Sequence, residues 1–342
     1  MLLLAAGMIV VAGMRAFAAS LGPIFLALVL IVLVRPLQME LTKRGMPPWL
    51  GAAALIAASY GILLVIAGSL AWSITALVDL LGSGTYQAEF EDLRLQAVDL
   101  LARFGVEGED LQNAVNQLDV GSVAGQVSSA VSGLFGFLSL LSLLMLTMLF
   151  MAVDTDRFVA QVDGPMAAER PELAAAFQSF ARSTRSYFWV STVFGVIVAV
   201  FDVVALLVLG IPLALVWGVL SVITNYIPNV GFILGVIPPA ILALLEGGWQ
   251  LMVVVIVVYA VINMVIQTVI QPRVVGDTVG LSATLTFLSL IFWGWVFGAL
   301  GALLAVPMTL FVKAVMIDID PAVRWLSPLV SLEKPGDPPA PA

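Results

Sequence analysis

The sequence predicts an all-α polytopic membrane protein with about eight membrane helical segments, roughly six full spans and two broken or re-entrant hairpins. Hydrophobic residues make up 61% of the 342 residues and charged ones 11%, against about 45–50% and about 25% in soluble domains. Long charge-free runs alternate with short charged loops, and a helix needs only about 20 apolar residues to cross a bilayer. The runs cover residues 16–34, 45–78, 120–153, 186–201, 203–245, 247–272 and 278–312.

Missing residue types exclude most enzyme chemistry. The chain has no Cys and no His, so it lacks the ligands of a common zinc site, a thiol nucleophile and a Ser-His triad. It has no Gly-rich phosphate loop with its Lys, which argues against ATP-driven pumping. A net charge of −8 disfavours nucleic acid, whose phosphates attract basic surfaces. We therefore expect a protein of the lipid bilayer that is no enzyme and has no metal site, no cofactor and no nucleic-acid partner.

Lys and Arg residues indicate the topology, because short loops rich in them stay in the cytoplasm. Arg35, Lys43 and Arg44 mark the first cytoplasmic loop. The N-terminus is then expected inside, with residues 1–81 forming a membrane scaffold. The expected helices of this scaffold cover residues 2–18, 20–38 and 49–80.

Residues 82–130 form the expected external insert. Acidic residues outnumber its two basic ones, Arg94 and Arg103, as suits a translocated segment. Apolar residues recur there at three- and four-residue steps, which is the pattern of amphipathic helices. Two short helices are expected to cover the outer face, either as a solvated cap or oligomer contact, or as a domain that captures substrate.

The chain is expected to return inward as a helix over residues 131–153. Residues 154–186 then carry four arginines and an apolar stripe that follows Pro171, which indicates an interfacial helix leading into a span at 187–209. The last basic residues place the C-terminus in the cytoplasm too. The tail at 319–342 ends in a Pro-rich segment that is expected to be disordered.

Helix breakers interrupt two apolar segments in the C-terminal half. The segments are 212–246, broken at 225–231, and 281–312, broken at 294–301. Arms of roughly 14–16 residues reach about 21–24 Å, short of the roughly 30 Å hydrocarbon core. Non-helical backbone survives at membrane depth only beside protein or water, so a transport site is expected here. The residues expected to make the breaks and gates are Pro228, Gly231, Gly235, Pro238, Gly298, Gly301 and Pro307.

Each hairpin follows a helix, at 187–209 and 249–270, and the two units run in opposite directions. They are interpreted as an inverted repeat over residues 187–318, the arrangement that places substrate sites near the midplane of secondary transporters. The alternative is two ordinary helix pairs that are rich in Gly and Pro.

Three motifs of this half resemble those of the autoinducer-2 exporter (AI-2E) family of bacterial membrane proteins. They are Ile-Pro-Asn-Val-Gly at 227–231 with Gly235 and Pro238, Pro-Arg-Val-Val-Gly at 272–276 with Gly280 and Leu281, and Gly298 with Gly301 and Pro307. The resemblance covers nearly the whole chain. It implies a place in the bacterial inner membrane and a homo-oligomer, for which a pentamer is expected. It also implies efflux of a small solute or signalling molecule such as the quorum-sensing molecule autoinducer-2, or alternatively sodium (lithium)/proton antiport. The chain has Ser282-Ala283 and Trp189-Val190 where the family often has His-Pro and Gly-Gln.

Polar residues within the apolar segments are the candidates for transport. Asp202 lies in the middle of the span at 187–209, where an ionisable group is costly and a functional candidate by default. It is interpreted as a site of proton or sodium coupling, or else as an Asp that is hydrogen-bonded to a neighbouring helix. Amides near the breaks can bind a polyhydroxylated solute or a hard cation, or can link helices. These amides are Asn225, Asn229, Asn263 and Gln267.

At the predicted cytoplasmic end of the 249–270 helix, Pro272, Arg273, Gly276 and Asp277 are expected to form either a gate with an ion pair or a positive-inside anchor. The favoured mechanism is ion-coupled alternating access, in which an elevator-like C-terminal repeat moves against the N-terminal scaffold. A passive channel and a non-transporting membrane scaffold are the remaining alternatives.

Overall fold

The computed structural model describes residues 2–82, 91, 95, 120–228, 230–271 and 281–319. Every element in these ranges is a helix, and they contain no strand. The α-helices are α1 (Leu2–Ala16), α2 (Ala18–Lys43), α3 (Pro48–Gly82), α6 (Val120–Gln161), α7 (Ala167–Glu169), α8 (Pro171–Val208), α9 (Ala214–Thr224), α10 (Gly231–Asn263), α12 (Ala283–Phe297), α13 (Ala299–Leu303) and α14 (Ala305–Lys313). Three π-helical turns adjoin them, namely η1 (Val162–Met166), η2 (Met264–Ile270) and η3 (Ala314–Asp318).

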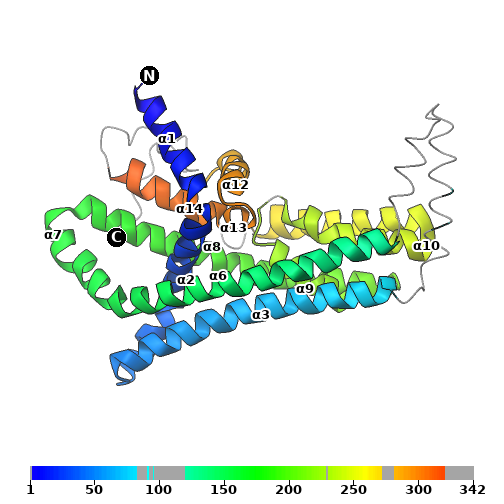
Figure 1. Cartoon of the computed structure of the whole chain (residues 1–342), viewed down its shortest axis with the longest axis horizontal. Helices are drawn as coiled ribbons and strands as arrows, with labels where there is room; N and C mark the ends of the chain where they lie inside the picture. The colour runs from blue at the N-terminus through cyan, green and yellow to red at the C-terminus, as the bar shows by residue number, and fades with distance from the viewer. Residues whose placement is uncertain are drawn as a thin grey trace.

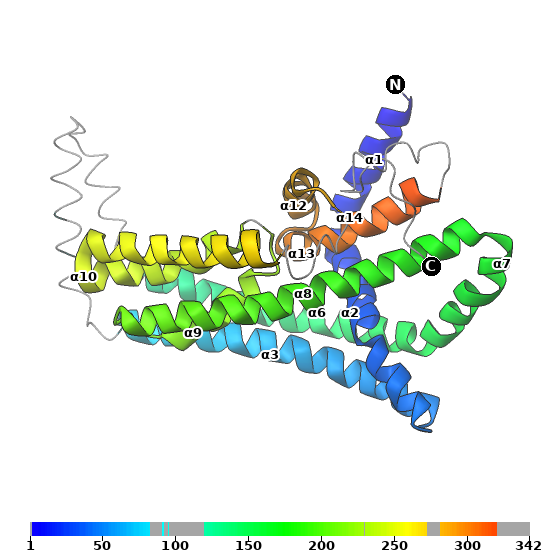
Figure 2. The same cartoon turned by 180° about the vertical axis from the view of Figure 1, so that it is seen from behind.

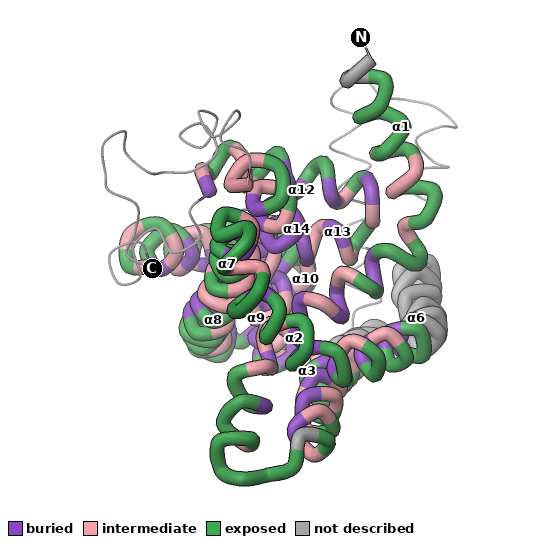
Figure 3. Tube along the Cα trace, turned by 90° about the vertical axis from the view of Figure 1, so that its left-hand side faces the viewer, coloured by how far each residue is buried: buried purple, intermediate pink, exposed green. Residues whose placement is uncertain are grey.

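The helices confirm an all-α polytopic membrane protein. Four described stretches are long and apolar enough to cross a bilayer, namely Ala18–Lys43, Trp49–Ser73, Pro171–Val208 and Gly231–Ile270. Shorter apolar helices lie at Ala5–Ala16, Ala214–Thr224 and Ala283–Phe297. In Figure 3, exposed residues line α1 and the outer sides of α7 and α8, whereas buried ones gather toward the middle of the helix cluster.

The exposed side chains of α8 mark where this helix meets lipid. Its exposed large apolar residues begin at Trp189 and continue to Val208. This stretch measures about 28 Å at 1.5 Å per residue, close to the roughly 30 Å hydrocarbon core. The exposed residues before Trp189 are small or polar, among them Glu172, Gln178 and Arg182. The apolar part of α8 therefore begins close to the expected start of the span at residue 187.

Several helix boundaries differ from those expected. The helix predicted at 131–153 runs from Val120 to Gln161 as α6, so residues 120–130 are helical and belong to it. The interfacial helix and the following span form one continuous helix, α8, because the sequence has no proline between Pro171 and Pro212 to end it. Hydropathy predicts where lipid begins, but a helix ends only at a breaker or a cap.

Hairpin one consists of α9 and the first arm of α10, and residues 225–228 and 230 lie in the turn between them. A Cβ atom at Gly231 would overlap the carbonyl oxygen of Thr224, so the two arms meet at a distance that only glycine allows. Two hydrogen bonds at Tyr226 hold the tip of the hairpin to α8. The Tyr187 hydroxyl donates to the Tyr226 carbonyl at 2.7 Å, and the hydroxyls of Thr192 and Tyr226 lie 2.8 Å apart.

The chain reverses again within α10, where Gly247 and Gly248 leave the helical conformation. Gly248 has φ 73°, a left-handed value that side chains other than glycine rarely adopt. Phe232 and Asn263 line the same pocket, although a straight helix would separate them by about 46 Å. The second arm of α10 therefore runs back beside the first, as Figures 1 and 2 show.

Hairpin two comprises α12, α13 and α14. Its break lies at Gly298, where φ is 66°, and not over the whole range 294–301, because α12 continues to Phe297. A Cβ atom at Gly301 would overlap the Trp293 carbonyl oxygen, the same kind of contact that Gly231 makes in hairpin one. Thr309 Oγ1 donates to Ser289 Oγ at 2.7 Å and accepts from Trp293 Nε1 at 2.9 Å.

Four of the residues expected at the breaks lie inside helices instead, and one of them is Gly301, in the middle of α13. Gly235 and Pro238 are within α10, and Pro307 is within α14. Gly235 has a packing role, because a Cβ atom there would come within 3.0 Å of Thr224 Oγ1. A proline within a helix removes one N–H donor, and neither Pro238 nor Pro307 ends its helix in this fold.

Two large hydrophobic clusters divide the core. The first joins α2, α3 and α6 with hairpin two, and the second joins α8, α9 and α10. Ile227 and Val230, at the tip of hairpin one, pack against the first cluster. In Figures 1 and 2, α3 and α6 run side by side along the long axis of the molecule. Hairpin one thus belongs to the second cluster and contacts the first through its tip, and the polar site described next lies against it.

Candidate functional site

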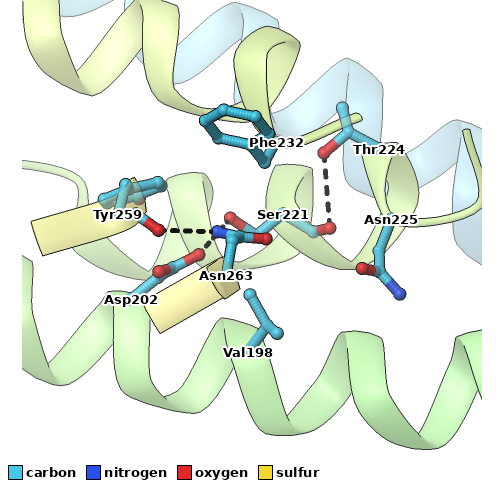
Figure 4. A pocket seen from close by; sticks show the side chains of 8 residues that line it. All are labelled: Val198, Asp202, Ser221, Thr224, Asn225, Phe232, Tyr259 and Asn263. Carbon is cyan, nitrogen blue, oxygen red and sulfur yellow. Dashed lines mark hydrogen bonds between the residues drawn. The ribbon is translucent and has the colours of Figure 1, made fainter. Parts of the chain in front are cut away.

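A pocket in the membrane region opens between α8, hairpin one and the second arm of α10. Its volume is about 10 Å³, roughly the space that one water molecule or one small ion needs. Figure 4 shows polar side chains that converge on it from three helices. The lining residues are Val198, Asp202, Ser221, Thr224, Asn225, Phe232, Tyr259 and Asn263.

Asp202 is the ionisable group of this pocket, and its residue is 1% exposed. Ser221 Oγ donates to its Oδ2 at 2.8 Å, whereas Oδ1 has no hydrogen-bond partner. The Tyr259 hydroxyl, which is within electrostatic reach of Asp202, is also buried without a partner. No Lys or Arg in the described ranges pairs with Asp202. A lone carboxylate in an apolar interior is costly unless a proton or a cation neutralises it.

A chain of amides connects the hairpin tip to the second arm of α10. Gln267 Nε2 donates to Asn225 Oδ1 at 2.6 Å and to Asn263 Oδ1 at 2.9 Å. Asn225 Nδ2 donates in turn to the Ser191 carbonyl of α8 at 2.8 Å, and Asn263 Nδ2 to the Tyr259 carbonyl at 2.9 Å. These bonds tie α8, hairpin one and α10 together beside Asp202.

Gly195 of α8 leaves room for this network. A Cβ atom there would lie 2.9 Å from Asn225 Nδ2, closer than side chains tolerate. The absence of a side chain at this position lets the Asn225 amide lie against α8 and reach the Ser191 carbonyl.

We expect Gln267→Leu to destabilise the protein by about 1–2 kcal/mol, because two amide oxygens lose their donor while the volume changes little. The measurement is thermal unfolding of the purified protein in detergent. The matched control is Gln250→Leu, since Gln250 is exposed on the second arm of α10, which η2 with Gln267 continues. Equal melting temperatures for the two variants would contradict a structural role for the amide chain.

The structure brings together four of the five residues that were predicted to bind the substrate or ion. Asp202, Asn225 and Asn263 line one pocket, and Gln267 joins two of them. Asn229, Pro272, Arg273, Gly276 and Asp277 lie outside the described residues. Pro228 lies in the turn of hairpin one, where its carbonyl accepts from the Val230 N–H at 2.7 Å.

Sequence reasoning missed the hydroxyl groups of the pocket. Ser221 lies three positions before Thr224 and four before Asn225, at the end of α9. Tyr259 precedes Asn263 by four positions, about one turn. This helical spacing to a predicted amide was an available signal. The contact between Ser221 and Asp202 could not be predicted from the sequence, because it depends on the conformation of the turn between α8 and α9.

The arrangement suits a proton or one small hard cation. A single carboxylate, hydroxyl oxygens and amide carbonyls surround a space with no room for a larger solute, and oxygen ligands are those that hard cations prefer. The described residues contain no cluster of three acidic side chains that could hold a divalent metal ion.

Known proteins resemble this chain over most of its length. The sequence model of the family described as "AI-2E family transporter" matches residues 1–320. "AI-2 transport protein TqsA" of Escherichia coli (strain K12) is 31% identical over 307 residues, which is 89% of this chain and 88% of that protein. "Putative transport protein YhhT" of the same strain is 26% identical over 310 residues, with 90% and 87% covered. A "Putative transport protein" of Haemophilus influenzae is 26% identical over 321 residues, with 91% and 90% covered.

Proposed function

Because the chain belongs to the AI-2E family of transporters, we propose that it is an ion-coupled secondary transporter. Its relatives TqsA and YhhT are transport proteins and not enzymes. In this proposal it exports a small polar solute across the bacterial inner membrane. The observation that carries the proposal is the buried Asp202, whose Oδ1 has no partner, beside hairpin one, whose arms belong to the second cluster and whose tip contacts the first.

Coupling follows from the cost of the bare carboxylate. With a proton or sodium ion bound, Asp202 is neutralised and hairpin one can stay closed over it. Without that ion the lone charge favours an arrangement that admits water. Occupancy of the site would therefore shift the balance between two conformations, as coupled transport requires.

Hairpin one is the element that we propose to move. Its tip is held to α8 and η2 by a few hydrogen bonds at Tyr226 and Asn225, and Ile227 and Val230 pack against the first cluster. Larger motion of the whole 187–318 repeat, as in an elevator, requires hairpin two to leave the hydrophobic cluster that it shares with α2, α3 and α6. The contacts thus support the smaller movement as the first step.

Sodium (lithium)/proton antiport is the second candidate function. The observation that favours it is the size of the pocket, about 10 Å³, which suits an ion or a water molecule better than a polyhydroxylated solute. In this case Asp202 would bind the two ions in turn.

The test is transport by the purified full chain in liposomes with imposed proton or sodium gradients. Autoinducer-2 leads the solute panel because the relative TqsA is an AI-2 transport protein, and further small polyols complete the panel. We expect solute to accumulate against its gradient only while the ion gradient lasts, with protein-free liposomes and a collapsed gradient as controls. Ion exchange without solute movement would favour the antiporter. Solute flux that does not depend on either ion gradient would favour a passive channel, and the absence of any flux would favour a non-transporting scaffold.

Orientation and assembly stay predictions. The arginines of the α6–α8 connection and of the α2–α3 loop place these loops in the cytoplasm under the positive-inside rule. The homo-oligomer, with a pentamer as the expected form, rests on the family resemblance.

A further inference from the structure

Three arginines gather where α2 crosses α8. Arg182 and Arg185 lie one turn apart on α8, and Arg35 belongs to α2, which packs against α8. Burial lowers the pKa of Arg185, and the charges of Arg35 and Arg182 lower it further. Arg35 and Arg185 are partly buried, whereas Arg182 is exposed. This arginine cluster is separate from the Asp202 pocket, since none of its members lines that pocket.

No acidic side chain in the described part of the protein neutralises the arginine cluster. Arg35 Nε is buried and has no hydrogen-bond partner. Arg185 Nε donates only to the Ala181 carbonyl, at 3.1 Å. Two basic residues elsewhere differ in this respect, because Arg44 pairs with Glu40 at 3.1 Å and Lys313 with Asp318 at 3.3 Å.

The arginine cluster lies at the boundary between the polar and the apolar part of α8. Trp189, one turn beyond Arg185, is 71% exposed and begins the lipid-facing stretch of the helix. Tryptophan is enriched at membrane interfaces, so this turn lies at the depth of the lipid headgroups. Basic residues at such a depth, between membrane helices, commonly bind anionic headgroups.

We propose that Arg35, Arg182 and Arg185 form a binding site for a phosphate-bearing anion, with the headgroup of an anionic phospholipid as the favoured ligand. Like charges held this close are unfavourable until an anion joins them. The planar guanidinium fork binds two phosphate oxygens at once, and the free Arg35 Nε–H is a donor that such an oxygen satisfies. Occupation would fasten α2 of the scaffold to α8.

The test uses the purified full chain with Arg35→Gln and Arg185→Gln, and Arg157→Gln as the matched control, since Arg157 is an exposed arginine of α6 outside the cluster. One arm measures retention of phosphatidylglycerol against phosphatidylcholine by native mass spectrometry. The other measures thermal stabilisation by inorganic phosphate. Arg35→Lys, which keeps the charge but removes the fork, is a further variant and is expected to lie between wild type and Arg35→Gln.

We expect the two cluster variants to bind phosphatidylglycerol at least about tenfold more weakly, equivalent to about 1.4 kcal/mol, while Arg157→Gln binds as wild type does. The same loss in the phosphate arm alone would identify the ligand as a free anion from the aqueous phase. Equal binding by the cluster and control variants, or no binding of either anion by the wild type, would overturn the proposal.

Discussion

Replacing Asp202 with Asn is expected to reduce gradient-driven transport about 100-fold, to near the level of liposomes without protein. An ionised Asp at the centre of a membrane helix costs about 2.5–3.5 kcal/mol, which corresponds to roughly a 100-fold shift in the balance of two conformations. Asn has almost the same shape and can still accept from Ser221 Oγ, now 2.8 Å from Asp202 Oδ2. It cannot exchange a proton or neutralise a cation, so only the coupling is lost.

The melting temperature of the Asp202→Asn protein should equal or exceed that of the wild type, since a costly ionisable group has left the interior. The control is Asp154→Asn, because Asp154 is exposed near the end of α6, and this variant should transport normally. Full coupled transport by Asp202→Asn would show that Asp202 only links α8 to α9.

The largest effect on stability is expected from Gly301→Ala, with Gly231→Ala a parallel case. Each added Cβ atom would overlap a backbone carbonyl oxygen, that of Trp293 or Thr224, and backbone cannot turn aside as a side chain can. Overpacking of this kind costs about 1–3 kcal/mol, occasionally more. We expect a loss of about 3 kcal/mol, measured as a lower melting temperature in detergent and as poor recovery of folded protein.

Gly294→Ala is the matched control in hairpin two. Its new Cβ atom would meet only the Ala302 Cβ, at 3.9 Å, an ordinary contact. Because Ala favours a helix over Gly by up to about 1 kcal/mol, the control should be as stable as the wild type or slightly more so. Equal melting temperatures for Gly301→Ala and Gly294→Ala would contradict the close approach of Gly301 to the Trp293 carbonyl in hairpin two.

Hydropathy and breakers predict the fold class and most helices, but not where every helix ends. The Gly-Gly pair at 247–248 and the break beside Pro228 could be found because each combines an apolar run with residues that leave the helix. The start of α6 at Val120 and the continuity of α8 could not be predicted. Residues 120–130 are helical despite Gly121 and Gly125, residues 172–186 carry neither Gly nor Pro, and a change of polarity does not end a helix. Pro238 and Pro307 show the converse, because packing keeps both inside helices.

The candidate site was predictable in part. An Asp in an apolar run stands out against hydrocarbon, and so do amides beside a break, which is why Asp202, Asn225 and Asn263 were found. Ser221 and Tyr259 were not, because a hydroxyl in an apolar helix is common and its neighbours depend on tertiary structure. Tyr259 reaches Asp202 only because the chain reverses at Gly248, and no local pattern gives the register of the two arms.

The most direct measurement is ion movement driven by solute in liposomes that contain the purified protein, with internal pH and sodium reported by trapped dyes. Coupling is reciprocal, so an outward solute gradient should move protons or sodium in the opposite direction, and Asp202→Asn should abolish this movement. We expect ion movement in the wild type that stops when the solute gradient is dissipated. Solute flux in the wild type with no accompanying ion movement would contradict ion-coupled transport at Asp202.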